Sequence, residues 1–193
     1  MKKFLCLFLA MIAVLSVSLP VSAASVDSEE TEIELSLDEF GNAGVTYGYV
    51  VYESETAYFN LANPDESAAF EAIQDNTNAN SRSVQPRSIG TFHVGIQKSG
   101  SAYRMHYTVT GSGLLSAVGY MKCKSTELLF ASTYHDEYFK KSSTGTSSMS
   151  GYSNTFTLPS GTTSVKVGWH DVTIRDGDGE ASVANKYATV TVN

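Results

Sequence analysis

The sequence predicts a mainly β protein, preceded by a signal peptide and by an acidic, partly disordered region with one short helix. Two observations predict the β class. Apolar and polar residues alternate over most of the segment from 88 to 193, which is the period of a half-buried strand. Turn-forming residues interrupt this alternation roughly every eight to fifteen residues, as expected for short antiparallel strands.

The first 23 residues have the three parts of an export signal. Lys2 and Lys3 give a positive start, residues 4–17 are almost entirely apolar, and Val21–Ala23 matches the small-residue pattern before a cleavage site. The apolar run is too short for a transmembrane helix. We therefore expect a mature chain that starts at Ala24, has no integral membrane segment and is secreted by a bacterium.

Charge divides the remaining chain into two regions. Between Ala24 and Ser81 there are thirteen carboxylates and no Lys, Arg or His, whereas from Arg82 onward eleven Lys and Arg face seven Asp and Glu. The division predicts a signal peptide over 1–23, an acidic region over 24–87 and a β domain over 88–193.

Two elements are expected within the acidic region. Residues 45–52 are rich in β-forming side chains and predict a strand, whereas 27–39 predict a solvated tail. Asn63 and Pro64, followed by two acids, have the residue types of a helix start. The polar run 76–87 predicts a linker.

Two hypotheses account for the acidic region. In the first, residues 24–87 are a prosegment that docks on the β domain by opposite charge and is released by cleavage at Arg82 or Arg87. In the second, the negative charge keeps an exported β protein soluble. The second hypothesis is slightly favoured, because two arginines in a loop are a weak processing signal.

The β domain is predicted strand by strand. The first two strands, 91–97 and 103–109, form a hairpin around Ser99 and Gly100. A turn at 111–113 is expected to lead to strands at 114–124 and 127–134, and 138–141 begins or extends another strand. A loop or polar edge at 142–151 is followed by strands at 152–158 and 165–174, a turn at 175–179 and a last strand at 181–192. The apolar phase slips between Trp169 and Val172, which indicates a β-bulge near His170 or Asp171.

These strands predict an antiparallel β-sandwich of the immunoglobulin-like or fibronectin-like kind. The likeness is architectural, because the paired cysteines of antibody domains are missing. Cys6 leaves with the signal peptide, so Cys123 has no partner within the mature chain. Alternation places Cys123 with Met121, on the face opposite Lys122, which favours a buried thiol over a reactive one.

Asp176, Asp178 and Glu180 are the best candidates for metal chemistry. Carboxylates at alternate positions resemble part of a calcium loop. Asp-Gly is also a strong hairpin signal, and a plain turn is the favoured interpretation. Calcium binding by these three residues is left open.

The histidines give weaker candidates. His170 precedes Asp171 beside the predicted bulge, and His135 precedes Asp136, but adjacent residues on a strand point to opposite faces. His93 and His106 lie on the first hairpin and can face each other across it. The spacings do not bring ligands together on one element, so no residue is assigned to metal binding, catalysis or a cofactor.

Tyrosines suggest a binding surface. Tyr120, Tyr134, Tyr138 and Tyr152 are not easily placed in the core, and exposed tyrosines suit sugar stacking or protein contact. The alternative is that they cover the second sheet or the acidic region.

The sequence as a whole favours a secreted, non-catalytic protein that binds an extracellular protein or glycan. The alternatives are a bacteriocin-like effector with an acidic prosegment and a small secreted hydrolase. Nucleic acid is not an expected partner, because the positive excess after residue 82 is small and its lysines are scattered. The oligomeric state is left open.

Overall fold

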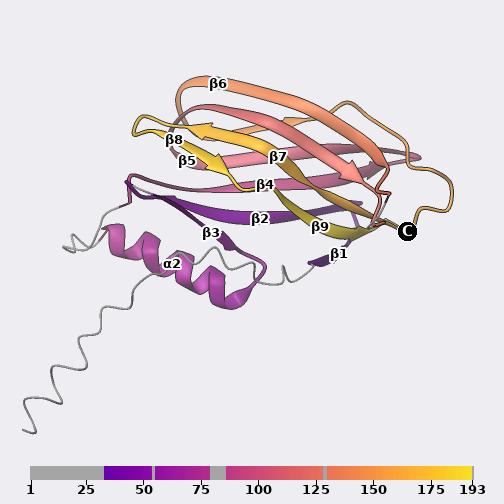
Figure 1. The fold of residues 1–193 in the computed structure, drawn as a ribbon, viewed down its shortest axis with the longest axis horizontal. Helices are drawn as coiled ribbons and strands as arrows, with labels where there is room; N and C mark the ends of the chain where they lie inside the picture. The colour runs from indigo at the N-terminus through magenta and orange to yellow at the C-terminus, as the bar shows by residue number, and fades with distance from the viewer. Residues whose placement is uncertain (1–32, 54, 79–85, 128–129, 193) are drawn as a thin grey trace, which may run out of the picture. The chain divides into compact units, whose positions relative to one another are not determined.

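The computed structural model describes residues 33–53, 55–78, 86–127 and 130–192. The described residues form one sheet and one helix (Figure 1). The elements are β1 (Glu34–Ser36), β2 (Asn42–Val51), β3 (Thr56–Asn60), α2 (Pro64–Asn78), β4 (Ser88–Ser99), β5 (Ala102–Lys124), β6 (Thr133–Tyr152), β7 (Ser164–Arg175), β8 (Glu180–Val183) and β9 (Lys186–Thr191). The predicted signal peptide and the cleavage candidate Arg82 lie outside the described residues.

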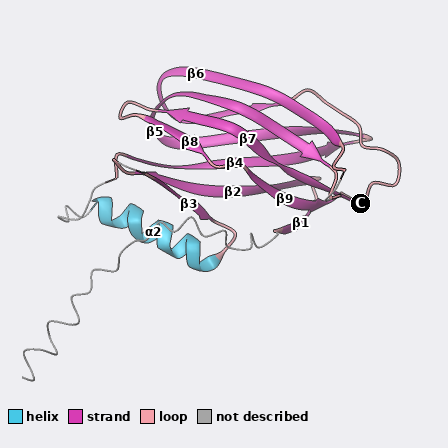
Figure 2. Ribbon diagram, in the orientation of Figure 1, coloured by secondary structure: helices cyan, strands magenta, loops and turns pink. Residues whose placement is uncertain are grey.

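The strands follow the order β1-β9-β7-β5-β4-β2-β3, with β6 also paired to β5 and β8 to β7 (Figure 2). The predicted mainly β class is therefore confirmed. The sheet is mixed, because β1 runs parallel to β9 while the other pairs are antiparallel. The structure assigns all these strands to a single curled sheet, and the predicted immunoglobulin-like sandwich is not established by it.

The curl arises in β5, which changes partners along its length. Its first half pairs with β4 as far as Gly111, and its second half pairs with β7 from Ser116 to Lys124. Gly113 has a φ of 63°, a left-handed conformation that glycine adopts without steric cost. Residues 111–113, predicted as a turn between two strands, are thus a bend within one strand.

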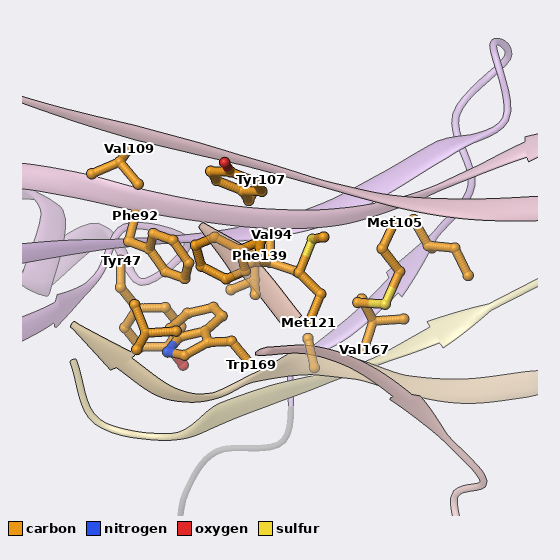
Figure 3. Close-up of a cluster of buried hydrophobic side chains, with 14 of the residues drawn as sticks. Tyr47, Phe92, Val94, Met105, Tyr107, Val109, Met121, Phe139, Val167 and Trp169 are labelled. Atoms are coloured by element: carbon orange, nitrogen blue, oxygen red, sulfur yellow. The ribbon is translucent and has the colours of Figure 1, made fainter. Parts of the chain in front are cut away.

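The curled sheet closes around an aromatic core (Figure 3). Trp169 of β7 is fully buried and meets Tyr47 of β2 and Phe92 of β4 edge to face, with ring centroids 5.4 and 4.8 Å apart. Tyr107 and Phe139 stack at 4.2 Å. Strands distant in the sequence therefore share one apolar interior.

The acidic region contributes directly to this sheet. The predicted strand at 45–52 is confirmed as β2, which pairs with β4 from Asn42 opposite Gln97 to Val51 opposite Ser88. Residues 34–36, predicted as part of a solvated tail, form β1, because the backbone N–H of Thr189 donates to the carbonyl of Ile33 and the strand pairs with β9. The sheet thus includes strands on both sides of the predicted boundary at residue 87.

Helix α2 begins as predicted and covers the outer face of β2 and β3 (Figure 1). The backbone N–H of Asp65 donates to Asn63 Oδ1 at 3.0 Å, which is the expected cap. Phe70 is buried against Phe59, with ring centroids 5.6 Å apart, and against the bare Cα of Gly48. The helix continues to Asn78, into the segment predicted as linker.

The remaining strand predictions succeed in part. The hairpin of β4 and β5 is confirmed, and 142–151 is a polar edge within β6. The strand expected at 127–134 is wrong for its described residues before Thr133, because Ser125 bonds to Ser132 and closes a loop there. The strand expected at 152–158 reduces to a bridge between Phe156 and Tyr103, and the one expected at 181–192 is divided into β8 and β9.

The predicted β-bulge is confirmed. Val118 pairs with Thr173 and Tyr120 pairs with His170, so one residue of β5 lies opposite two residues of β7. Asp171, within the bulge, has a φ of 51°, a conformation that is uncommon for residues other than glycine. The bulge turns the side chain of Asp171 toward that of His170.

Candidate functional site

The outer face of the second half of β5, with its neighbours β6, β7 and β9, carries a group of aromatic and charged side chains. We call it the Tyr120 face and define it by Tyr120, Lys122, Lys124, Asp136, Tyr138, His170, Asp171 and Tyr187. On these strands the alternate residues point into the core, so the members of the face project outward.

Tyr120 and His170 form its centre. Their rings are stacked, with centroids 4.7 Å apart and planes inclined by 6°. Tyr138 lies beside them, at 5.3 Å from the ring of Tyr120. Tyr120 and Tyr138 are 37% and 52% exposed, so their rings are available to a ligand.

Two carboxylates hold the imidazole of His170. Its Nδ1 lies 2.9 Å from Asp171 Oδ2, and its Nε2 lies 3.0 Å from Asp136 Oδ1. Adjacent side chains on a regular strand point to opposite faces, but the bulge turns Asp171 to the same face as His170, which allows their contact. Both ring nitrogens are engaged, which suits a fixed ring better than a general base.

Lysines border the aromatic centre. Burial would raise the pKa of Asp136, but hydrogen bonds from His170 and Lys122 lower it, and the carboxylate stays ionised at neutral pH. Lys124 Nζ lies 3.9 Å from the ring centroid of Tyr187. The pKa of Lys124 is lowered by burial and then by the positive charges of Lys166 and Lys122.

A second cluster lies on the outer face of β2, β4 and the first half of β5. We call His93 and His106 the histidine pair. Their Nε2 atoms are 3.2 Å apart, which confirms that the two side chains face each other across the hairpin. His93 Nδ1 lies 2.9 Å from Thr46 Oγ1, whereas the buried His106 Nδ1 has no hydrogen-bond partner among the described residues.

Burial keeps the histidine pair neutral at physiological pH. It lowers the pKa of His93, and it lowers that of His106 to about 4, with further contributions from His93 and Arg104. Arg104 is itself engaged, since its Nε donates to Gln97 Oε1 at 2.8 Å and its guanidinium lies 4.1 Å from the ring of Tyr152.

The structure explains the Asp176–Glu180 segment as a turn. Asp176 is only 6% exposed, and its Oδ1 accepts the backbone N–H groups of Asp178 and Gly179, each at 2.9 Å. The hairpin turn is confirmed. Across the described ranges, no three side chains of His, Cys, Asp or Glu converge as a potential metal site.

His135 and Asp136 do not form a pair. His135 stacks on Phe156, with centroids 4.5 Å apart, while its Nε2 lies 3.2 Å from Glu137 Oε2 without the geometry of a hydrogen bond. Asp136 belongs to the Tyr120 face on the other side of β6. Cys123 is fully buried, as predicted, and burial raises the pKa of its thiol to about 12.

Among the tyrosines singled out from the sequence, the Tyr120 face contains Tyr120 and Tyr138. Tyr152 is 61% exposed but lies beside His106, on the other outer face. Tyr134 is half-buried against the core. Sequence alternation identified the tyrosines, but not that β7 would place His170 beside Tyr120.

The helix in the described residues is not long and apolar enough to cross a membrane. Comparison with protein-family models, with curated proteins and with solved structures finds no match to this chain.

Proposed function

We propose that this chain is a secreted, non-catalytic protein that binds an extracellular glycan through the Tyr120 face. The observation that carries the proposal is the flat, partly exposed stack of Tyr120 on His170, with Tyr138 beside it. An aromatic ring presents an apolar surface to the apolar face of a sugar ring, while its phenol can hydrogen-bond to hydroxyl groups.

The surroundings of the stack favour a sugar over a protein as the occupant. The stack is bordered by Asp136, Asp171 and Lys122. Their carboxylates can accept hydrogen bonds from sugar hydroxyl groups, and the lysine can donate to them. The centre of a typical protein interface is instead depleted of charged residues. Here Asp136 and Asp171 lie within hydrogen-bond distance of His170 in the stack, and Lys122 forms an ion pair with Asp136.

The lysines favour an acidic glycan. Lys122 and Lys166 are close enough to Lys124 to lower its pKa, so their charges act together on this face. A polymer that carries carboxylates would relieve this repulsion, and its binding would weaken with salt.

We also retain, as part of the proposal, a two-layer arrangement of the immunoglobulin-like kind. It is supported by the contacts of Trp169 with Tyr47 and Phe92, which join the β7 and β2–β4 parts of the curled sheet across one core. Such a layout leaves two outer faces for binding.

The test is affinity electrophoresis of the purified protein in gels that contain polygalacturonate, neutral xylan or no polysaccharide. Retardation by polygalacturonate that decreases with salt is expected. Tyr120→Ala should weaken binding about tenfold, the loss expected when one stacking contact of about 1.4 kcal/mol is removed. Tyr152→Ala is the matched control, because it removes an exposed tyrosine from the other face.

Equal retardation of wild type and Tyr120→Ala would contradict the assignment to this face. Migration unaffected by either polysaccharide, together with capture of a defined extracellular protein that Tyr120→Ala abolishes, would show that the face binds protein instead.

A further inference from the structure

The histidine pair has the geometry of a metal chelate. We propose that His93 and His106 bind a divalent transition-metal ion through their Nε2 atoms, with water in the remaining coordination positions. The expected ions are Cu²⁺, Ni²⁺ and Zn²⁺, for which imidazole is a favoured ligand. Mg²⁺ and Ca²⁺ prefer oxygen ligands and are not expected to bind. The proposal is independent of glycan binding, because the pair lies where the first half of β5 pairs with β4 and shares no residue with the Tyr120 face.

The distance between the two nitrogens fits this class. Nitrogen ligands about 2.0–2.1 Å from a metal are about 2.9 Å apart at a right angle and about 3.4 Å apart at the tetrahedral angle. The two Nε2 atoms are 3.2 Å apart, between these values. A metal can therefore be bound with little movement of either ring.

Thr46 provides the outer contact that such a ligand needs. Metal-bound histidine donates its other ring N–H to a neighbouring acceptor, which fixes the tautomer. His93 Nδ1 lies 2.9 Å from Thr46 Oγ1, and donation from this nitrogen leaves the lone pair of Nε2 directed at the metal position. His106 has its Nδ1 buried, so Nε2 is its available ligand atom.

Two glycines hold the rings in place. A Cβ on Gly44 would come within 2.6 Å of His93 Cε1, and one on Gly95 would come within 2.4 Å of His106 Cε1. The imidazoles therefore lie against bare backbone on the neighbouring strands. Both rings are therefore restricted before a metal binds, which reduces the side-chain conformational entropy lost on binding.

The imidazoles are also in the required protonation state. Their burial disfavours the charged form, so both are neutral near pH 7 and keep a lone pair. Arg104 contributes an unfavourable positive charge, and only two protein ligands are available among the described residues. We therefore expect weaker binding than in sites with three or four protein ligands.

The experiment is isothermal titration calorimetry of tag-free protein at pH 7.5, with CuCl2, NiCl2, ZnCl2, CaCl2 and MgCl2 as separate titrants. We expect one Cu²⁺ per chain, weaker binding of Ni²⁺ and Zn²⁺, and no binding of Ca²⁺ or Mg²⁺. His93→Gln and His106→Gln should each weaken Cu²⁺ binding at least about tenfold, since each removes one of two ligands. His135→Gln is the matched control, because His135 lies outside both clusters, and it should bind Cu²⁺ as the wild type does.

Electron paramagnetic resonance of the Cu²⁺-loaded wild type provides a measurement that does not depend on the folding of any variant. Hyperfine coupling to two imidazole nitrogens supports the proposal. Coupling to one or none would overturn it, as would equal Cu²⁺ affinities in the wild type and in folded His93→Gln and His106→Gln proteins.

Discussion

At the position of Gly119, the backbone of β5 passes the bulge of β7 with no room for a side chain. A Cβ there would lie 2.5 Å from Val172 Cγ2 and 2.8 Å from its Cα. The second of these atoms is backbone, which cannot rotate away. The missing side chain of Gly119 therefore allows the bulge that brings Asp171 to His170.

We predict that Gly119→Ala destabilises the protein by about 1–3 kcal/mol, the usual cost of overpacking. Urea denaturation followed by circular dichroism measures the change. Gly177→Ala is the control, because a Cβ at Gly177 meets nothing within 4 Å. Equal stability of the two variants would show that β5 and β7 separate easily at the bulge.

Cys123 should be chemically inert in the folded protein. It is fully buried, and burial raises the pKa of its thiol to about 12, so almost no reactive thiolate exists at pH 8. We expect negligible labelling of Cys123 by Ellman's reagent in buffer and full labelling of Cys123 in urea. Rapid labelling of the native protein would mean that the core around β5 opens frequently.

The histidine pair should make the protein sensitive to acid. An unfolded histidine has a pKa of about 6.5, whereas His106 has a pKa of about 4 in the folded protein. Protons therefore bind more tightly to the unfolded chain. The contribution of His106 to stability is complete above about pH 6.5 and is lost as the pH falls toward 4.

Urea denaturation at several pH values between 4 and 7, with a chelator present, measures this loss. His106→Gln should show a shallower decline of stability over this range. Parallel declines in the wild type and the variant would assign the acid sensitivity to other groups, such as His93, whose pKa is also lowered.

At the scale of elements, β2 is the strand that ties the acidic region to the rest. It pairs with β4 along its length and buries Val45, Tyr47 and Tyr49 in the shared core. Removal of residues 24–87 would expose the hydrogen-bonding edge of β4 and would leave Trp169 without Tyr47. A detachable prosegment does not easily account for these contacts.

We predict that a fragment of residues 88–193 alone does not fold, and that addition of the 33–87 fragment restores the fold. Near-ultraviolet circular dichroism, which reports on packed aromatic rings, distinguishes the outcomes. The full chain nicked at Arg87 should keep both pieces together until denaturant is added. A folded, soluble 88–193 fragment would support an independent β domain instead.

The elements also show what local sequence can predict. The start of α2 and the β4–β5 hairpin depend on residues close in the chain, such as Asn63 and Gly100, and both were predicted correctly. The bulge was also predicted, because it shifts the apolar phase within β7. The bend of β5 was predicted as a turn between two strands. Gly111 and Gly113 are compatible with a turn and with a bend, and only the change of partner from β4 to β7 shows that the strand continues.

For the whole molecule, the order of strands could not be predicted from alternation. β1 lies beside β9 although their partners Leu35 and Val190 are far apart in the sequence, and pairing of this kind leaves no local pattern. The candidate sites could not be predicted for the same reason, because they too depend on which strands pair. Tyr120 and His170 were each singled out, but their stacking depends on the register of β5 with β7.

A single core predicts a single unfolding transition for the described part of the chain. Trp169 is the only tryptophan, and its ring touches both β2 and β4. Its fluorescence and far-ultraviolet circular dichroism should therefore give the same denaturation midpoint in urea. A lower midpoint by circular dichroism would indicate that elements away from Trp169, such as α2 and β3, unfold before the rest.

The change of partner in β5 places the two proposed binding sites on different halves of this strand. The side chains of His106 and Tyr120 both project outward from this one strand, but His106 lies where β5 pairs with β4 and Tyr120 lies where it pairs with β7. A bulky polymer held at Tyr120 would leave the histidines accessible to small ions in the medium. One protein could therefore bind a polysaccharide at one half of β5 and exchange a metal ion at the other half.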